Sequence, residues 1–138
     1  MLFPNEKIIV TDNFDVHQDW DVPIPGFFII VSTRGRISLL DFSAKEREDF
    51  FELMVKLRRG MKEVLGIKEV SFFQDESTHH KLFHMWIFPR YDWMDKFGEK
   101  IQAIRPIIEY SKQEMTDEKN IFEVKSAVQK MKKYCSSF

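Results

Sequence analysis

Residues 79–90 have the sequence HHKLFHMWIFPR and contain three of the four histidines of the chain. Large apolar residues, including Phe, Trp and Ile, fill the stretch up to Pro89 and are typical of a strand. This stretch is therefore predicted to be a β-strand that runs up to Pro89. Alternate residues of a strand share a face, and that face would hold His80, Leu82, His84, Trp86 and Phe88.

A metal site in this stretch is the alternative. In a helix, His80 and His84 would stand at i and i+4, the spacing of two zinc ligands. The glutamate that accompanies this spacing in zinc proteases is missing, because Lys81 and Leu82 follow His80. In a strand, residues four apart are separated by roughly 13 Å, which is too far for one small ion. We therefore expect neither a metal nor another cofactor.

The preceding sequence predicts several short strands. Residues 7–16, KIIVTDNFDV, indicate strand, turn and strand, whereas residues 17–26 contain two prolines and a glycine and predict a turn. The apolar run FFIIVST, residues 27–33, suits a strand covered on both faces. A further short strand is predicted at residues 69–74, EVSFFQ.

A long amphipathic helix is predicted over residues 44–65. Ser43 is a suitable N-cap with Glu46 three residues on, and Gly66 follows the last turn. Apolar residues recur at three- and four-residue spacing and would lie on one face: Phe50, Leu53, Met54, Leu57, Met61, Val64 and Leu65. Beyond Arg90 the spacing of Met94, Phe97, Ile101 and Ile104 again predicts a helix, and Thr116 could cap a last one.

Composition excludes several classes of protein. With 138 residues, 43% hydrophobic and 31% charged, the chain has the profile of a globular protein. A formal net charge of −1 disfavours binding to a nucleic-acid polymer, and the single Cys135 excludes disulfides and cysteine zinc sites. No apolar run approaches the roughly 20 residues of a membrane span, and no signal peptide is evident. We expect a cytoplasmic protein.

The segment LFHMWIFPR resembles the signature strand of the histidine triad (HIT) family, in which three histidines alternate with hydrophobic residues. Alignment on Pro89 and Arg90 puts the triad positions at Leu82, His84 and Trp86, so only the middle histidine is present. In that family the middle histidine is the nucleophile.

Other segments agree with the resemblance in order and spacing. Pro25-Gly26-Phe27 stands where the family commonly has a Pro-Gly-His turn, Leu40-Asp41-Phe42 precedes the long helix, and Gln74 follows a short strand. The resemblance covers residues 7–90, about two-thirds of the chain. It implies an α+β fold, with an antiparallel sheet of about five strands and the long helix on one face. We expect one HIT-like domain over residues 1–138, with a core at about 7–90 and a helical extension at about 91–134.

The resemblance also implies chemistry at the α-phosphate of a nucleotide. The expected activity is that of a hydrolase or nucleotidyl transferase acting through a nucleotidyl-histidine. Its substrate would be a dinucleoside polyphosphate, such as a diadenosine polyphosphate, or a nucleoside phosphoramidate, and HIT proteins usually form homodimers. His84 is the predicted catalytic residue, and the candidate substrate-binding residues are Gln74, Thr78, His79, His80 and Trp86.

Departures from the family pattern leave a second function open. Leu82 and Trp86 replace two triad histidines, Phe27 replaces the turn histidine, and the loop before the signature has no glycine. These changes remove groups that would orient the nucleophile or bind the phosphate. The alternative is a catalytically weak or inactive nucleotide-binding protein with the same fold. Asp19 and Trp20 lie near the position from which the family binds the ribose.

Overall fold

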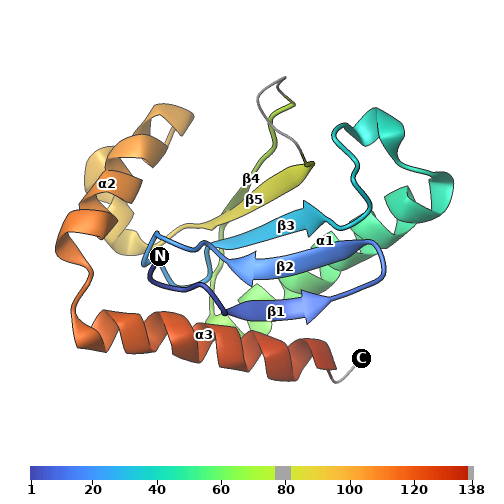
Figure 1. Cartoon of the computed structure of the whole chain (residues 1–138). Helices are drawn as coiled ribbons and strands as arrows, with labels where there is room; N and C mark the ends of the chain where they lie inside the picture. Colours follow the sequence, from blue (N-terminus) through green and yellow to red (C-terminus); the bar gives the residue numbers. More distant parts are fainter. Residues whose placement is uncertain (77–81, 137–138) are drawn as a thin grey trace.

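A five-stranded antiparallel sheet forms the centre of the computed structural model, which describes residues 1–76 and 82–136 (Figure 1). The strand order is β1-β2-β3-β5-β4. The strands are β1 (Lys7–Val10), β2 (Phe14–Gln18), β3 (Phe28–Ser32), β4 (Val70–Phe73) and β5 (His84–Pro89). The α+β class and the predicted strand at His84 are confirmed. The predicted turn at residues 17–26 begins two residues too early, because His17 and Gln18 complete β2 and pair with β3.

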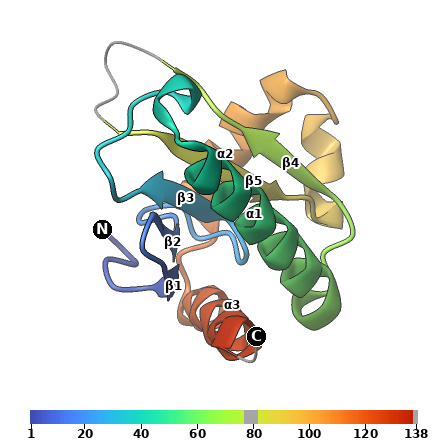
Figure 2. The same ribbon diagram turned by 90° about the vertical axis from the view of Figure 1, so that its right-hand side faces the viewer.

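Helix α1 (Ala44–Leu65) has the predicted bounds and covers one face of the sheet (Figure 2). The Ser43 hydroxyl accepts the Glu46 N–H at 3.1 Å, and the helix ends at Gly66. The apolar stripe of α1 is buried against alternate residues of the strands, which lie on one face of the sheet. The resulting core includes Phe50, Leu53, Leu57 and Met61 from α1, and Phe14, Val16, Phe28, Ile30 and Ile87 from the sheet.

Helix α3 (Glu118–Ser136) packs along α1 and the edge strand β1, with Val128 and Met131 in the same core (Figure 1). The helix begins after Asp117, whose carboxylate accepts the N–H of Asn120 at 3.4 Å. The predicted cap at Thr116 is therefore one residue early.

Helix α2 (Ile104–Glu114) lies on the other side of the sheet from α1 (Figure 2). Two 3-10 helices precede it, η2 (Asp92–Phe97) and η3 (Ile101–Ala103), with a turn at Gly98 between them. The single helix predicted from the spacing after Arg90 is therefore interrupted, and Pro106 lies in the first turn of α2, where its missing N–H is tolerated. This segment forms a second core with the sheet, whose members include Phe27, Ile29, Phe88, Met94 and Ile107.

Within the described residues, no helix combines the length and the apolar character that a membrane span requires.

The loop between β3 and α1 is fixed to both the helix and the start of β5. The Arg36 guanidinium donates to both Glu46 carboxylate oxygens, at 3.0 and 2.7 Å. The Arg36 carbonyl accepts the Phe83 N–H at 2.7 Å, and the Ser32 N–H donates to the Phe83 carbonyl at 3.0 Å. Phe83 directly precedes His84, so the ion pair supports the point at which β5 begins.

We expect the Glu46→Gln variant to be less stable than the unsubstituted protein at neutral pH and equally stable in acid. The hydrogen bond from Arg36 lowers the pKa of Glu46 below its usual value. A carboxyl whose folded pKa is depressed stabilises the protein above its unfolded pKa, near 4.3, and this stabilisation is lost as pH falls through the folded pKa. Urea midpoints should therefore differ most between the two proteins at neutral pH and converge below about pH 4. Glu48→Gln, an exposed position on the same helix, is the control, and an equal gap at every pH would contradict the prediction.

Candidate functional site

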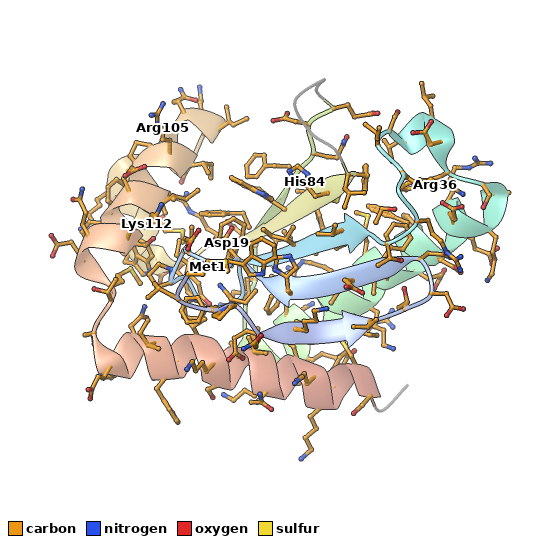
Figure 3. The ribbon with its side chains drawn as sticks, viewed as in Figure 1. Met1, Asp19, Arg36, His84, Arg105 and Lys112 are labelled. Atoms are coloured by element: carbon orange, nitrogen blue, oxygen red, sulfur yellow. The ribbon has the colours of Figure 1, made fainter. Side chains whose placement is uncertain are left out.

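His84 is the first residue of β5 and lies on the sheet face opposite α1. It pairs with Val31 of β3, while the next residue, Met85, packs toward the α1 side. The His84 ring is half-buried, and its Nδ1 lies 3.3 Å from the Leu82 carbonyl oxygen. A carbonyl can only accept, so this contact requires the proton on Nδ1 and leaves the lone pair on Nε2. Figure 3 shows His84 above β5, with Asp19 lying toward α2.

Strand register brings a second histidine onto the same face. His17 of β2 pairs with Ile29, which pairs with Trp86, which pairs with Phe73 of β4. These four residues form one row across four strands, and His84 lies two residues from Trp86 along β5. The sequence alone does not identify His17 as a site residue, because its distance from His84 depends on the pairing of β2, β3 and β5.

His17 is 7% exposed and stacks on the indole of Trp20, with ring centroids 4.8 Å apart and planes at 14°. Its Nδ1 lies 2.7 Å from the Gln18 carbonyl oxygen, the same type of contact that orients His84. Trp20 itself is 48% exposed. Asp19 follows β2, and its Oδ1 accepts the N–H groups of Asp21 and Val22, both at 2.9 Å.

Two pockets meet at His84 and Trp86, which line both of them. The β2-side pocket, of about 280 Å³, is otherwise lined by His17, Asp19, Trp20, Asp21, Ile29, Val31 and Leu82. The β4-side pocket, of about 480 Å³, is otherwise lined by Phe72, Phe73, Gln74, Asp75, Ile101 and Ile104. The half-buried imidazole of His84 thus lies where one bound molecule could extend into both pockets.

The two aromatic residues at positions where the resemblance predicts histidines contact each other. Phe27 is fully buried, and its ring meets that of Trp86 edge to face at 5.1 Å and that of Phe88 at 5.0 Å. These contacts bury apolar surface where the family pattern has imidazoles. Trp86 therefore combines a core contact through Phe27 with a wall of both pockets.

The turn before Phe27 is tightly constrained. The Tyr91 hydroxyl donates to the Pro25 carbonyl, and burial raises the pKa of Tyr91 above its usual value. Gly26 has a φ of 86°, and a Cβ there would lie 2.7 Å from Cδ1 of Ile67. The glycine is thus required both by its backbone conformation and by the close approach of Ile67.

Some of the other predicted site residues line one of the two pockets, and some lie outside the described residues. Gln74 lines the β4-side pocket, and its side-chain amide donates to the Asp75 carbonyl at 3.0 Å. Leu82 lines the β2-side pocket and is 41% exposed. The predicted binding residues Thr78, His79 and His80 lie outside the described residues.

No group of three metal-ligating side chains gathers anywhere in residues 1–76 and 82–136. Of His80 and His84, the two histidines with zinc-ligand spacing, His80 lies outside those residues.

The architecture is similar to that of known structures, although the sequence has no recognised relative. No family model and no curated protein matches the chain in sequence. A solved structure of a zinc-bound histidine triad family protein from Mycobacterium smegmatis superposes with a TM-score of 0.64 at 13% identity, covering 98% of this chain and 89% of that one. A Plasmodium falciparum diadenosine triphosphate hydrolase gives 0.64 at 15%, covering 97% and 78%.

A Hit-like protein from Bartonella henselae superposes with a TM-score of 0.61 at 15% identity, covering 93% of this chain and 84% of that one. The matches extend over nearly the whole chain, including the helices that follow β5. The chain has the fold of the histidine triad proteins.

Proposed function

We propose that the chain is a divergent histidine triad protein that hydrolyses or transfers a nucleotide at its α-phosphate, with His84 as the nucleophile. One observation carries the proposal. The His84 ring lies between two pockets, and the Leu82 carbonyl is placed to hold the tautomer that leaves Nε2 able to attack.

The reaction divides into two displacements at phosphorus. The Nε2 lone pair of the His84 imidazole forms the new bond to phosphorus while the bond to the leaving group breaks. The ring then carries a positive charge, which the Leu82 carbonyl stabilises through the Nδ1 proton. Water, or another acceptor, attacks next, the phosphorus–Nε2 bond breaks, and its electron pair returns to the ring.

The β2-side pocket suits the nucleoside. The exposed indole of Trp20, which stacks on His17, offers a flat aromatic surface for a base, and Ile29 and Val31 form an apolar floor. The Asp19 carboxylate lies at the rim, where it could accept a ribose hydroxyl proton. A nucleoside there would direct its phosphate toward His84.

Donors to the phosphate remain proposals from the family resemblance. Gln74 lines the β4-side pocket together with His84 and is one candidate donor, and we assign the same role to Thr78, His79 and His80. Loss of one such donor typically costs 10²–10³ in rate, so two absent triad histidines predict a slow enzyme. The Phe27–Trp86 contact favours the second candidate, a nucleotide-binding protein without turnover, because two aromatic rings that pack against each other stand where the resemblance predicts imidazoles.

The test is to incubate the purified protein with diadenosine triphosphate and with adenosine 5′-phosphoramidate, and to measure adenosine monophosphate by chromatography. Release of the mononucleotide from either compound, in proportion to protein concentration, supports catalysis. Ligand-induced stabilisation without release would support the binding protein instead. Neither stabilisation nor release would refute both.

We also propose that the chain forms a homodimer. Phe51 on α1 is 64% exposed and Phe72 on β4 is 40% exposed, and both line one hollow with Met54 and Val55. β4 is an edge strand, and an exposed edge beside apolar side chains suits pairing with the same edge of a second copy. Sedimentation equilibrium should give twice the chain mass of 16.6 kDa, and a monomer at every concentration would refute the dimer.

A further inference from the structure

Positive charge is concentrated in the second half of α1 and in α3. Residues 56–65 contain four lysine and arginine residues and one glutamate, and residues 125–138 contain four lysines and no acidic residue. These two segments carry a formal charge of +7, whereas the rest of the chain carries −8. The net charge near zero therefore conceals a strongly basic surface, because the charges of opposite sign lie in different parts of the chain.

The two basic segments lie side by side. Helix α3 packs along α1 (Figure 2), and Tyr134 contacts α1 at Gly60, where an added Cβ would lie 2.8 Å from Cδ1 of the tyrosine. Lys130 lies one turn before Tyr134 on the same flank of α3, so it is also near α1. Lys130 and the neighbouring Lys133 are both exposed.

A hollow of about 460 Å³ opens where these segments meet β1. Tyr134 of α3 lines it together with Lys56 and Arg59 of α1. The four cationic side chains around Tyr134 are here called the basic ridge: Lys56, Arg59, Lys130 and Lys133. The apolar lining of the hollow comes from three residues, Ile9, Leu53 and Val55.

The other end of the hollow is acidic, which restricts the chemistry of a partner. Asp49 and Glu52 line it from the turns of α1 that precede Lys56, and Asp12 lines it from the loop after β1. A nucleic-acid backbone or an anionic membrane presents negative charge uniformly, so either would also meet these carboxylates. A protein segment can instead place its own carboxylates on the basic ridge and an apolar side chain in the hollow.

We propose that the basic ridge and its hollow bind an acidic segment of a partner protein, which inserts an apolar side chain into the hollow. This surface is separate from the candidate functional site, because α1 covers the face of the sheet opposite His84. The interaction is therefore independent of the proposed nucleotide chemistry, and the failure of either proposal leaves the other standing.

The probe is a fluorescein-labelled peptide of aspartate and glutamate with leucines at its centre, and its binding to the full chain is measured by fluorescence anisotropy. We expect binding at low salt that weakens as the salt concentration rises. The double variant Lys130→Glu, Lys133→Glu should bind the peptide about tenfold more weakly, because two attractive interactions become repulsive. Lys130→Gln with Lys133→Gln, which only removes the two charges, should give a smaller loss.

The matched control is the double variant Arg105→Glu, Lys112→Glu. It makes the same change of net charge at two exposed positions on α2, away from the C-terminal half of α3 (Figure 3). This variant should bind the peptide as the unsubstituted protein does. An equal loss in both glutamate variants would overturn the assignment to the basic ridge, and so would no binding of the peptide at low salt.

The remaining outcomes test the identity of the partner. A peptide with serine in place of the leucines should bind more weakly, and equal affinity would overturn the role of the hollow. Single-stranded DNA and phosphatidylserine vesicles are compared with the peptide at the same salt concentration. If either binds more tightly than the peptide and loses this affinity in the Lys130→Glu, Lys133→Glu protein, an acidic protein segment is the wrong partner.

Discussion

The His84→Asn protein should release mononucleotide at least about 10³-fold more slowly than the protein with His84, because the nucleophile is lost. Asparagine is chosen because its side-chain amide can still donate to the Leu82 carbonyl, the partner of Nδ1 at 3.3 Å. The start of β5 should therefore keep its hydrogen bonding. Turnover is measured by chromatography, and thermal melting checks that the fold is retained.

His17→Asn is the matched control for this prediction. His17 has the same type of contact from Nδ1 to a carbonyl, but lies on β2 beside Trp20. Its loss removes the ring that supports Trp20, the proposed surface for the base in both the ground state and the transition state, so KM should rise while kcat changes by less than about threefold. Protein labelled from an α-³²P substrate should carry phosphorus in the His17 variant and none in the His84 variant. Full turnover by His84→Asn would show that another group performs the displacement.

Local signals in the sequence were sufficient for α1 and β5. The N-cap at Ser43, the apolar stripe and Gly66 define a helix without reference to any other part of the chain. Residues 84–89 have strand composition and end at Pro89. The two 3-10 helices after Arg90 were harder to predict from the sequence. The apolar residues keep a helical spacing even where the backbone turns at Gly98.

The site was predicted only in part, for a physical reason. His84 could be found from the resemblance at Pro89 and Arg90, and alternation alone gave it the same face as Trp86. The place of His17 depends on two strand registers, and the contact between Phe27 and Trp86 joins residues far apart in sequence. No local pattern in the chain encodes such pairings.

Gly60, in the core, is a second example of a residue whose role depends on contacts between distant parts of the chain. Within a helix a glycine is expected to be a weak point, but here a Cβ would lie 2.8 Å from Cδ1 of Tyr134 and 2.9 Å from Cε of Met131. The glycine thus permits the close approach of α3 to α1. Its role depends on a helix that begins more than fifty residues later, so the sequence around Gly60 does not reveal it.

Phe50→Ala should lower the free energy of unfolding by about 3–5 kcal/mol, the usual cost of deleting a buried phenyl ring. Phe50 is 6% exposed, and its ring contacts those of Phe14, Phe42 and Phe83 at centroid distances of 5.3, 5.9 and 5.2 Å. The three remaining rings are themselves held by the sheet and the loop, so they cannot close the space by moving together. Natural domains are stable by about 5–15 kcal/mol, so this loss should markedly lower the urea midpoint.

Phe122→Ala is the control, because Phe122 is a phenylalanine on α3 that is 71% exposed, and its removal should change stability by less than about 0.5 kcal/mol. The comparison also concerns the site, since Phe83 lies between Phe50 and the first residue of β5. If the four rings position His84, the Phe50 variant should lose kcat under conditions where circular dichroism still shows it fully folded. Retained kcat in the folded variant would show that the backbone bonds from Phe83 to Ser32 and Arg36 are sufficient to hold the nucleophile in place.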